Sequence, residues 1–433
     1  METKLNRISE IAGKEGKCTF NNLIHHLNVE NLRECFYRLK KKKASGVDGV
    51  SFREYEKNLE ANLENLVARL KARSYRPQPL LRVYIEKDGG KGKQRPLGIP
   101  ATEDKIIQMG ITRLLGAIYE NDFRDSSHGF RPKRNCHTAL RRVNQITMHN
   151  PVHYVIDADI KGFFDNMSHE WMMRFLGDRI QDKRFLHLIA RFLKSGILEA
   201  GKYKKTEQGV PQGGVLSPML SNIYLHYVLD LWIERKVRKE TTGYVGFVRY
   251  ADDFLICVEH QADSERILRE LRDRLKKFGL ALSEEKTKIV IFGRKAKDNA
   301  ERTGGKPGTF DFLGFTHTNA KTRKGGYKIG RRTTRKNFNQ KIKAINEWLK
   351  AVRNVAKPKV WWKILCAKMR GHFQYYGVSE NADSLEKYRR KVVWLVLKWL
   401  NRRSQKRSMN WIQFYEYLKR HELPKYRIVH KLY

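Results

Sequence analysis

Acidic residues are scarce in this chain of 433 residues. Asp and Glu total 46 against 88 Lys and Arg, which gives a formal net charge of +42 at pH 7. Apolar runs are short, and none reaches the roughly 18 residues that span a bilayer. The first residues also lack the apolar core of a signal peptide. We therefore expect no membrane partner, and a surface this positive indicates a polyanion such as nucleic acid.

Cysteine is equally sparse, with five residues scattered at Cys18, Cys35, Cys136, Cys257 and Cys366. Their number is odd and no pair has the spacing of metal ligands. This excludes a zinc site and a disulfide framework, and it favours a reduced intracellular compartment.

The length suits two or three domains. Residues 1–43 are predicted to form a helical extension. Two extended segments within residues 81–100 flank a Gly/Lys-rich turn, which predicts a hairpin with a basic tip. Residues 152–292 mix strands and helices. We place a domain boundary near residue 320, beyond which apolar residues recur at helical spacing, as in 338–352.

Carboxylates follow an apolar, β-branched run that begins at Tyr154. Alternation along a strand puts Asp157 and Asp159 on the same face. Acids held at the end of a strand suit a metal site, although an exposed strand end is the alternative interpretation.

Two adjacent carboxylates, Asp252 and Asp253, lie between apolar arms within residues 245–258. This pattern predicts a β-hairpin with both acids at its tip. Asp is common in turns for local reasons. Here, however, both arms are apolar enough to be buried, and acids at the edge of a core need a cation.

A glycine-rich loop at residues 208–216 precedes a predicted helix that begins at Ser217-Pro218. Gly209, Gly213 and Gly214 allow the backbone to approach a ligand closely. Alone, this is a weak indication of a phosphate or nucleotide site.

Along the chain, the acids at a strand end come first, the glycine-rich loop and its helix second, and the acidic hairpin third. This order resembles that of a reverse transcriptase palm. The chain resembles the reverse transcriptase/maturase proteins of bacterial group II introns in the segments FVRYADD, QGVPQGGVLSPMLSNIYLH, DADIKGFFDNMSH, RPLGIP, SHGFRPKRNCHTAL and FDFLGF. The resemblance covers about residues 44–320. It implies an α+β right-hand polymerase, with fingers and palm in 44–320 and a helical thumb and maturase region in 321–433. It also implies an RNA-directed DNA polymerase in the bacterial cytoplasm.

The resemblance assigns roles to single residues. Two Mg²⁺ ions would be held by Asp159, Asp252, Asp253 and the carbonyl of Ile160. The incoming nucleotide would meet a further set, Lys87, Arg95, Phe164, Gln212 and Lys286. Among these, Lys87, Arg95 and Lys286 would lie near the triphosphate, Gln212 would contact the template or nucleotide, and Phe164 would block a ribose 2′-hydroxyl. The alternatives are plain surface charge for the basic residues and a core position for Phe164.

The C-terminal third carries charge without acidic clusters. Residues 321–336 hold eight Lys and Arg and no acid. The segment MRGHFQYYG weakly resembles the maturase segment called domain X, so we expect RNA contacts from Lys321, Arg323, Lys324, Arg331, Arg332, Arg389, Arg390 and Lys391. The alternative is a thumb whose charges are merely solvated and whose aromatic residues form its core.

The partners implied are an RNA template, in particular group II intron RNA, a DNA primer and deoxynucleoside triphosphates. The paired cysteines of an HNH endonuclease do not occur, so we expect no cleavage of a target strand. Two other interpretations remain. One is a free-standing polymerase of this type in DNA repair or phage defence, and the other is a purely RNA-binding splicing cofactor. The intact carboxylates argue against the cofactor, because a binder of polyanions has no use for them.

Overall fold

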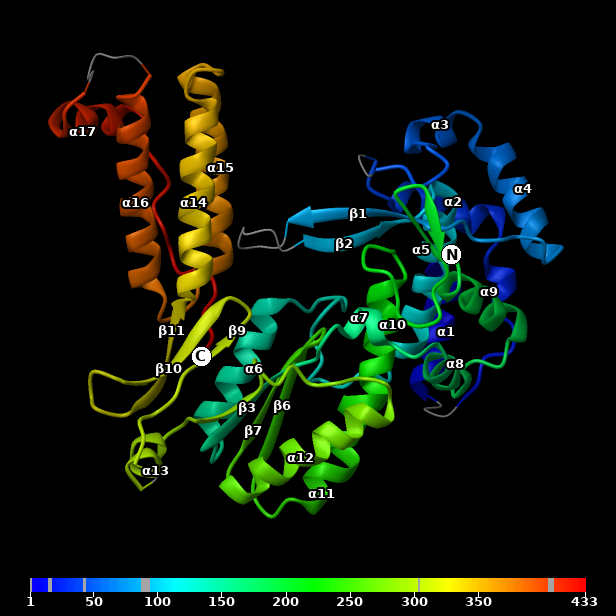
Figure 1. Ribbon diagram of the computed structural model, residues 1–433, viewed down its shortest axis with the longest axis horizontal. Helices are drawn as coiled ribbons and strands as arrows, with labels where there is room; N and C mark the ends of the chain where they lie inside the picture. The colour runs from blue at the N-terminus through cyan, green and yellow to red at the C-terminus, as the bar shows by residue number, and fades with distance from the viewer. Residues whose placement is uncertain (1, 15–17, 42–43, 87–93, 303, 404–408) are drawn as a thin grey trace. The chain divides into compact units, whose positions relative to one another are not determined.

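The computed structural model describes residues 2–14, 18–41, 44–86, 94–302, 304–403 and 409–433. The chain combines helices with strands (Figure 1), which confirms the predicted α+β class. It divides into two compact units. The first unit consists of residues 1–135, 158–256 and 262–288, and the second of residues 136–157, 257–261 and 289–433.

The first unit is built largely of helices, with a small sheet. Its elements are α1 (Glu2–Lys14), η1 (Ile24–His26), α2 (Val29–Arg38), α3 (Phe52–Lys57), α4 (Leu59–Lys71), β1 (Leu80–Glu86), β2 (Gln94–Ile99), α5 (Thr102–Tyr119), α7 (Phe163–Asn166), α8 (His169–Gly177), α9 (Lys183–Leu193), β4 (Ile197–Glu199), β5 (Lys202–Lys204), α10 (Ser217–Leu225), the π-helical turns η2 (His226–Asp230) and η3 (Ile233–Val237), α11 (Arg238–Glu240), β6 (Val245–Tyr250), most of β7 (Asp253–Val258) and α12 (Gln261–Lys277).

Helix α5 forms the centre of this unit, in contact with α1, α2 and α10. Ile107, Ile111, Leu114 and Ile118 recur at helical spacing and are fully buried. The apolar face of α5 thus provides the core on which the neighbouring helices pack.

Strands β1 and β2 pair antiparallel, with Ile85 opposite Arg95, which confirms the predicted hairpin. The sheet has the order β2-β1-β4-β5. The hairpin tip, including Lys87, lies outside the described residues.

The second unit holds a three-stranded sheet and a group of long helices. Its elements are α6 (Cys136–His149), most of β3 (Tyr154–Asp159), β8 (Lys288–Ile291), α13 (Ala296–Arg302), β9 (Phe310–Phe312), β10 (Phe315–Lys321), β11 (Tyr327–Thr333), α14 (Arg335–Val352), α15 (Pro358–Tyr376), α16 (Ala382–Leu400) and α17 (Trp411–Arg420).

The basic stretch 321–336 begins in strands rather than in helix. Strands β10 and β11 form an antiparallel hairpin, and the turn between them includes Gly325 at a φ of +82°. Glycine adopts this left-handed conformation without the steric cost of a side chain. The predicted boundary near 320 therefore falls at the end of β10, and the helical region begins at Arg335.

Helices α14, α15 and α16 run side by side (Figure 1). Leu365, Met369 and Phe373 recur every four residues on α15 and are buried. The Trp399 indole on α16 donates a hydrogen bond to the Asn346 amide oxygen on α14 at 2.9 Å. Apolar packing and this bond together fix the pairing of the helices.

A further sheet has the order β6-β7-β3-β8, and β3, β7 and β8 contribute residues to both units. Strand β7 lies beside β3, so the strand that starts at Asp253 neighbours the one that ends at Asp159. Among the described helices, none combines the length and apolarity needed to cross a bilayer.

Candidate active site

The turn that carries Asp252 and Asp253 connects β6 to β7. Ala251 adopts a φ of +58°, which L-residues rarely take. A Cβ atom on Gly129 would lie 2.4 Å from the Ala251 nitrogen, so only glycine fits there. The segment around Gly129 therefore packs directly on the acidic turn and helps to hold its unusual backbone.

Arg249, the last but one residue of β6, is fully buried beneath this turn. Its guanidinium donates to both carboxylate oxygens of Asp230, at 2.7 and 2.6 Å. It also donates to the Asn222 amide oxygen at 3.0 Å and to the Ala251 carbonyl at 3.1 Å. The Asn222 amide in turn donates to the Gly129 carbonyl at 2.7 Å. One side chain thus joins η2, α10 and the acidic turn.

Asp230 is buried together with Arg249, and both side chains are fully excluded from solvent. Burial raises the pKa of Asp230, but the charge and hydrogen bonds of Arg249 outweigh burial and hold this pKa below its usual value. Asp230 therefore remains ionised and paired. Sequence patterns did not reveal the pair, because the partners lie on different elements with no characteristic spacing.

Asp159 ends β3 and is held at its backbone by the segment that follows α12. The Ser283 amide donates to the Asp159 carbonyl at 2.8 Å, and Ile160 forms an isolated antiparallel bridge with Leu282. The same segment brings the Lys286 ammonium to 2.6 Å from the Asp159 carboxylate. Lys286, predicted to lie near the nucleotide, thus lies beside a predicted metal ligand.

Asp252 has a pKa above its usual value. Burial is the main cause, and the nearby charge of Asp159 adds to it, while Arg95 and Lys286 act in the opposite direction. Three other predicted site residues, Asp159, Arg95 and Lys286, are therefore close enough to influence the Asp252 carboxylate electrostatically. A half-buried carboxylate repelled by a second one fits a position that a cation would stabilise.

Within the described residues, no three His, Cys, Asp or Glu side chains converge as a complete metal-ligand set. The donors available are hard carboxylate oxygens, and they are few. Mg²⁺ is commonly held by one or two carboxylates, with substrate phosphates and waters completing its shell. The residues present therefore fit Mg²⁺ better than zinc, which favours closed sites with nitrogen and sulfur ligands.

The glycine-rich loop is held between two neighbours. A Cβ on Gly213 would lie 2.8 Å from the Gly98 carbonyl of β2, and one on Gly209 would lie 2.7 Å from the Asp165 carbonyl of α7. The Gln108 side chain of α5 accepts from the Val215 amide at 2.9 Å. These glycines permit close backbone contact, so the loop ties β2 to α7.

Phe164 and Gln212 are both half-buried and lie in this tied region. The Phe164 carbonyl accepts from the Val210 amide at 2.7 Å, and the Gln212 carbonyl accepts from the Gly98 amide at 2.7 Å. By contrast, the adjacent Phe163 is 2% exposed. Phe163 is therefore the core aromatic residue of α7, and Phe164 keeps part of its surface in solvent.

The residues predicted to bind RNA differ in exposure. Lys321, Arg323, Lys324, Arg332, Arg390 and Lys391 are exposed, and Arg389 is half-buried. The expectation for Arg331 is corrected, because this residue is 1% exposed and donates to the Asn144 amide oxygen at 2.8 Å. Its position on β11 directs it inward, which composition alone did not indicate.

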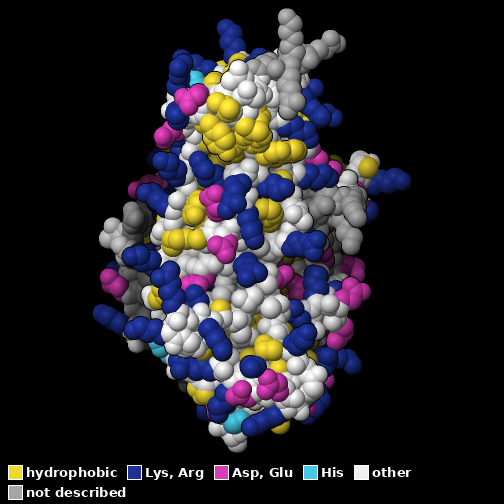
Figure 2. Space-filling view, turned by 90° about the vertical axis from the view of Figure 1, so that its left-hand side faces the viewer, with side chains coloured by type: hydrophobic (Ala, Val, Ile, Leu, Met, Phe, Trp, Pro, Cys, Tyr) yellow, Lys and Arg dark blue, Asp and Glu magenta, His cyan; other side chains and the backbone are white. Residues whose placement is uncertain are grey.

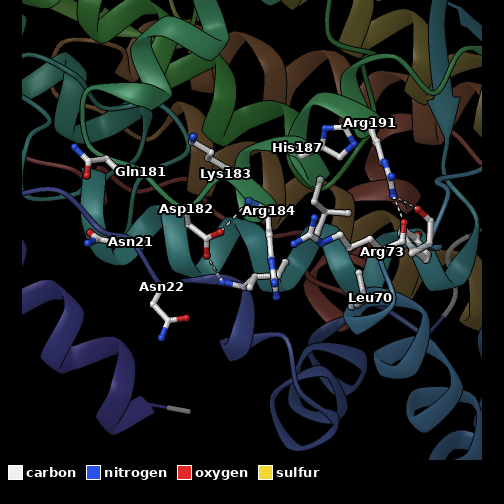
Figure 3. A pocket seen from close by; sticks show the side chains of 13 residues that line it. Asn21, Asn22, Leu70, Arg73, Gln181, Asp182, Lys183, Arg184, His187 and Arg191 are labelled. Carbon is white, nitrogen blue, oxygen red and sulfur yellow. Dashed lines mark hydrogen bonds between the residues drawn. The ribbon is translucent and has the colours of Figure 1, made fainter.

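A cavity of about 670 Å³ in the first unit contains none of the predicted site residues (Figure 3). Asp182 closes one side by accepting from the amides of Leu23 and Ile24, at 2.7 and 2.9 Å. In the described part of the chain, no acid forms an ion pair with the other charged lining residues, Arg73, Lys183, Arg184 and Arg191. The cavity is thus a basic recess, separate from the carboxylate site.

The family is established by comparison with known proteins. The model of the reverse transcriptase (RNA-dependent DNA polymerase) family matches residues 85–317, more than half of the chain. This segment includes the three carboxylates, the glycine-rich loop and Lys286. The chain therefore belongs to the reverse transcriptase family, as its motifs predict.

Its relatives within this family include intron-encoded proteins. The chain is 34% identical to the group II intron-encoded protein LtrA of Lactococcus lactis subsp. cremoris, over 55% of this chain and 49% of LtrA. It is 36% identical to protein YkfC of Escherichia coli (strain K12), over 56% of this chain and 71% of YkfC. A putative COX1/OXI3 intron 1 protein of Saccharomyces cerevisiae is 29% identical over 75% of this chain and 44% of its own length. The chain thus matches about half the length of LtrA.

We predict that Arg249→Met lowers the free energy of unfolding by about 3–5 kcal/mol, because it leaves Asp230 charged and unpaired in the core. The double variant Arg249→Met/Asp230→Leu should regain much of this stability. It should nevertheless remain poor in DNA synthesis, because the Ala251 carbonyl has lost its donor. Urea denaturation and primer extension measure the two effects.

Arg272→Met is the matched control, since Arg272 pairs with Glu284 on the surface at 2.9 Å. Such a pair contributes about 0–1 kcal/mol. Equal stability losses for the Arg249 and Arg272 variants would contradict the central role of the buried pair.

We predict that Asp252→Asn stabilises the metal-free protein at pH 7. A carboxyl group with a raised pKa in the folded state costs stability when ionised, and the neutral amide removes this cost. The melting temperature in EDTA should therefore rise, by about 2–4 °C for each kcal/mol gained. The difference should shrink as the pH falls through the raised pKa and wild-type Asp252 becomes neutral.

Asp273→Asn, at an exposed position on α12, provides the control for loss of one negative charge. A melting temperature that falls for Asp252→Asn at neutral pH would show that Asp252 is stabilised by protein partners rather than poised for a cation.

Proposed function

We propose that this chain is an RNA-directed DNA polymerase that also binds group II intron RNA and promotes its splicing and mobility. The observation that carries the polymerase assignment is the electrostatic cluster of Asp159, Asp252, Arg95 and Lys286. The similarity to LtrA, whose name describes it as intron-encoded, supports the intron partner.

In this proposal the chain is a right-hand polymerase. Residues 44–320 supply fingers and palm, residues 321–433 supply the thumb and maturase region, and residues 1–43 form an N-terminal extension. The β1–β2 hairpin corresponds to the fingertips, and the β6–β7 turn corresponds to the catalytic turn of the palm.

Asp159, Asp252 and Asp253, with the Ile160 carbonyl, would hold two Mg²⁺ ions. Two backbone hydrogen bonds flank the Ile160–Leu282 bridge, and they use the Asp159 carbonyl and the Lys161 amide. The Ile160 carbonyl takes part in neither of these two bonds. When bound, a pair of such ions stabilises charge on the attacking, transferring and leaving oxygens of a phosphoryl transfer.

The chain's own residues position the nucleotide. Arg95, exposed on β2, offers a guanidinium fork suited to two phosphate oxygens, and Lys87 would act beside it. Phe164 would lie against the sugar and exclude a 2′-hydroxyl by its bulk. Gln212 would meet the template or the incoming base, since its backbone is bonded to Gly98 of the same hairpin.

Lys286 would have one partner in the metal-free protein and another after metal ions bind. Its ammonium neutralises Asp159 in the metal-free protein. Once bound cations balance this carboxylate, the ammonium is available to an oxygen of the triphosphate and can donate a proton to the leaving pyrophosphate. In this proposal, one lysine thus serves a carboxylate first and a nucleotide afterwards.

An RNA surface on the second unit is supported by exposed aromatic residues beside cations. Arg389, Arg390, Trp394, Trp411 and Tyr415 border a cavity of about 610 Å³ on α16 and α17. The side chains of Trp394, Trp411 and Tyr415 are 49%, 43% and 56% exposed. Figure 2 shows hydrophobic side chains gathered near the top of one face, with Lys and Arg around them. Bases stack on such rings while phosphates meet the cations.

A free-standing polymerase is the second candidate function. YkfC, whose name mentions no intron, is about as similar to this chain as LtrA is. A group II ribozyme encoded in the flanking DNA would favour the intron enzyme.

We predict that the double variant Asp252→Asn/Asp253→Asn loses DNA synthesis by at least about a thousandfold, because bound metal ions contribute several kcal/mol to phosphoryl transfer. RNA binding should persist, since the lost groups are acidic. The triple variant Arg389→Gln/Arg390→Gln/Lys391→Gln should show the reverse pattern. Primer extension on an RNA template and protein-assisted splicing of a flanking intron measure the two activities.

A matched loss of three charges at the exposed residues Arg238, Lys239 and Lys276 should leave splicing intact. Near-normal extension by the double Asp variant, with Mg²⁺ as the sole divalent ion, would refute the palm assignment. If wild-type protein extends primers but splices no candidate intron, the free-standing polymerase replaces the intron enzyme.

We predict that Phe164→Ala raises incorporation of ribonucleotides relative to deoxynucleotides at least about tenfold, the scale on which a few buried groups set pocket specificity. Single-nucleotide extension with each nucleotide type measures the ratio. Phe163→Leu is the control, because it perturbs the buried neighbour and should lower stability without changing the ratio. Unchanged discrimination in Phe164→Ala would assign sugar selection to another residue.

A further inference from the structure

Another cavity of the second unit is lined by residues of α14, α15 and α16 and has no role in the proposed polymerase chemistry. Its volume is about 540 Å³, and its lining includes Lys341, Lys368, Gly371, His372, Tyr376 and Tyr388. This volume lies within the range of about 300–1,000 Å³ that is typical of small-ligand sites.

His372 is a buried polar side chain in the wall of this cavity. It is 7% exposed, and neither ring nitrogen has a hydrogen-bond partner within the described structure. Burial, aided by the charge of Lys341, lowers its pKa to about 3, so the ring is neutral and offers one donor and one acceptor. Buried polar groups are nearly always satisfied, so these nitrogens indicate a missing partner.

Aromatic rings lie beside the His372 ring, whose two nitrogens form the polar edge of the cavity wall. The His372 and Tyr388 rings stack with centroids 3.6 Å apart and planes 10° apart, and the Tyr376 ring lies 4.7 Å from His372. A flat, polarisable ligand with hydrogen-bonding groups at its rim matches such a wall. A nucleobase has both properties.

Gly371 provides an independent observation. Glycine is a poor helix former, yet Gly371 lies in the interior of α15. A Cβ added there would meet no heavy atom within 4 Å, and its φ is not in the left-handed region. Neither packing nor backbone conformation requires glycine at this position. Its effect is to leave the cavity open on the turn of helix that also carries His372.

Two cations lie at the lining, Lys341 on α14 and Lys368 on α15. Both residues are exposed, and the Lys368 ammonium also lies 5.2 Å from the Trp348 ring. No acidic residue belongs to the lining. Cations beside an aromatic wall suit a phosphate attached to a base.

We propose, resting on the proposed polymerase function, that this cavity binds one unpaired nucleotide of a single-stranded nucleic acid. The base enters between Gly371 and the stacked rings, where the His372 edge reads its hydrogen-bonding groups. The attached phosphate meets Lys341 and Lys368. The site thus holds a strand at one nucleotide, outside the carboxylate cluster.

The test uses full-length protein and a ten-nucleotide single-stranded RNA that carries one 2-aminopurine. Wild-type protein should quench the fluorescence in a saturable manner, because the base stacks on the aromatic wall. Gly371→Leu fills the cavity and should weaken binding at least about fivefold, the lower end of what one base stack contributes. His372→Phe should retain quenching but lose discrimination among unlabelled competitor strands that differ in the base at the labelled position.

Gly177→Leu is the matched control, because Gly177 also lies in a helix with open space around its Cβ position. It should bind RNA as wild type does. Gly371→Ala guards against misfolding, since alanine favours the helix, and its melting temperature should equal or exceed that of wild type. Gly371→Leu binding equal to wild type, in a folded protein, would overturn the proposal.

Two further binding measurements, with DNA and with AMP, identify the ligand. A DNA strand of the same sequence should bind through the same residues, whereas free AMP should bind at least about tenfold more weakly, because it lacks the neighbouring phosphates. AMP that binds as tightly as the strand would overturn the assignment to a polymer. Primer extension by wild-type protein separates the two proposals. If wild-type protein extends primers but Gly371→Leu does not weaken RNA binding, only the cavity proposal is refuted.

Discussion

The site depends on one buried ion pair. Arg249 and Asp230 lie wholly out of solvent, and the same guanidinium bonds the backbone of the turn that carries the acidic pair. A buried charge pair is tolerated only with nearly complete hydrogen bonding, and here Asn222 helps to complete it. Because the pair fixes helix, strand and turn together, the carboxylates are presented by rigid elements rather than by a flexible loop. Catalytic groups need this kind of support to act on a substrate without first being ordered.

The glycine-rich loop extends this order to the residues proposed to meet the nucleotide. Gly209 and Gly213 allow backbone contacts that any side chain would block. The contacts join the strand that carries Arg95 to the helix that carries Phe164. A shift of the hairpin is therefore transmitted to Phe164. The Arg249–Asp230 pair positions the acidic turn, and the backbone contacts of the loop position the groups expected to hold the nucleotide.

The strands and the turn that carry the carboxylates were predictable from sequence, because their signals are local. Asp159 and Asp252 follow apolar strands, and period-two alternation and turn composition are local signals. The Arg249–Asp230 pair was not predictable, because tertiary folding brings its members together. Arg331 was misjudged for a related reason, since a basic stretch does not reveal which of its residues face inward. The His372 cavity likewise arises from three helices and leaves no motif in the chain.

The ion pair between Lys286 and Asp159 has a consequence for how the protein matures. Carboxylates that lie close together repel one another, and many metal sites fold only when the metal ion binds. Here an internal cation balances one carboxylate from the start. Folding of the first unit therefore does not have to wait for a metal ion. In the proposed function, the chain can associate with RNA before nucleotide and metal ions are present. For the proposed polymerase, competence for catalysis is then a late event, set by the arrival of nucleotide and ions rather than by the fold.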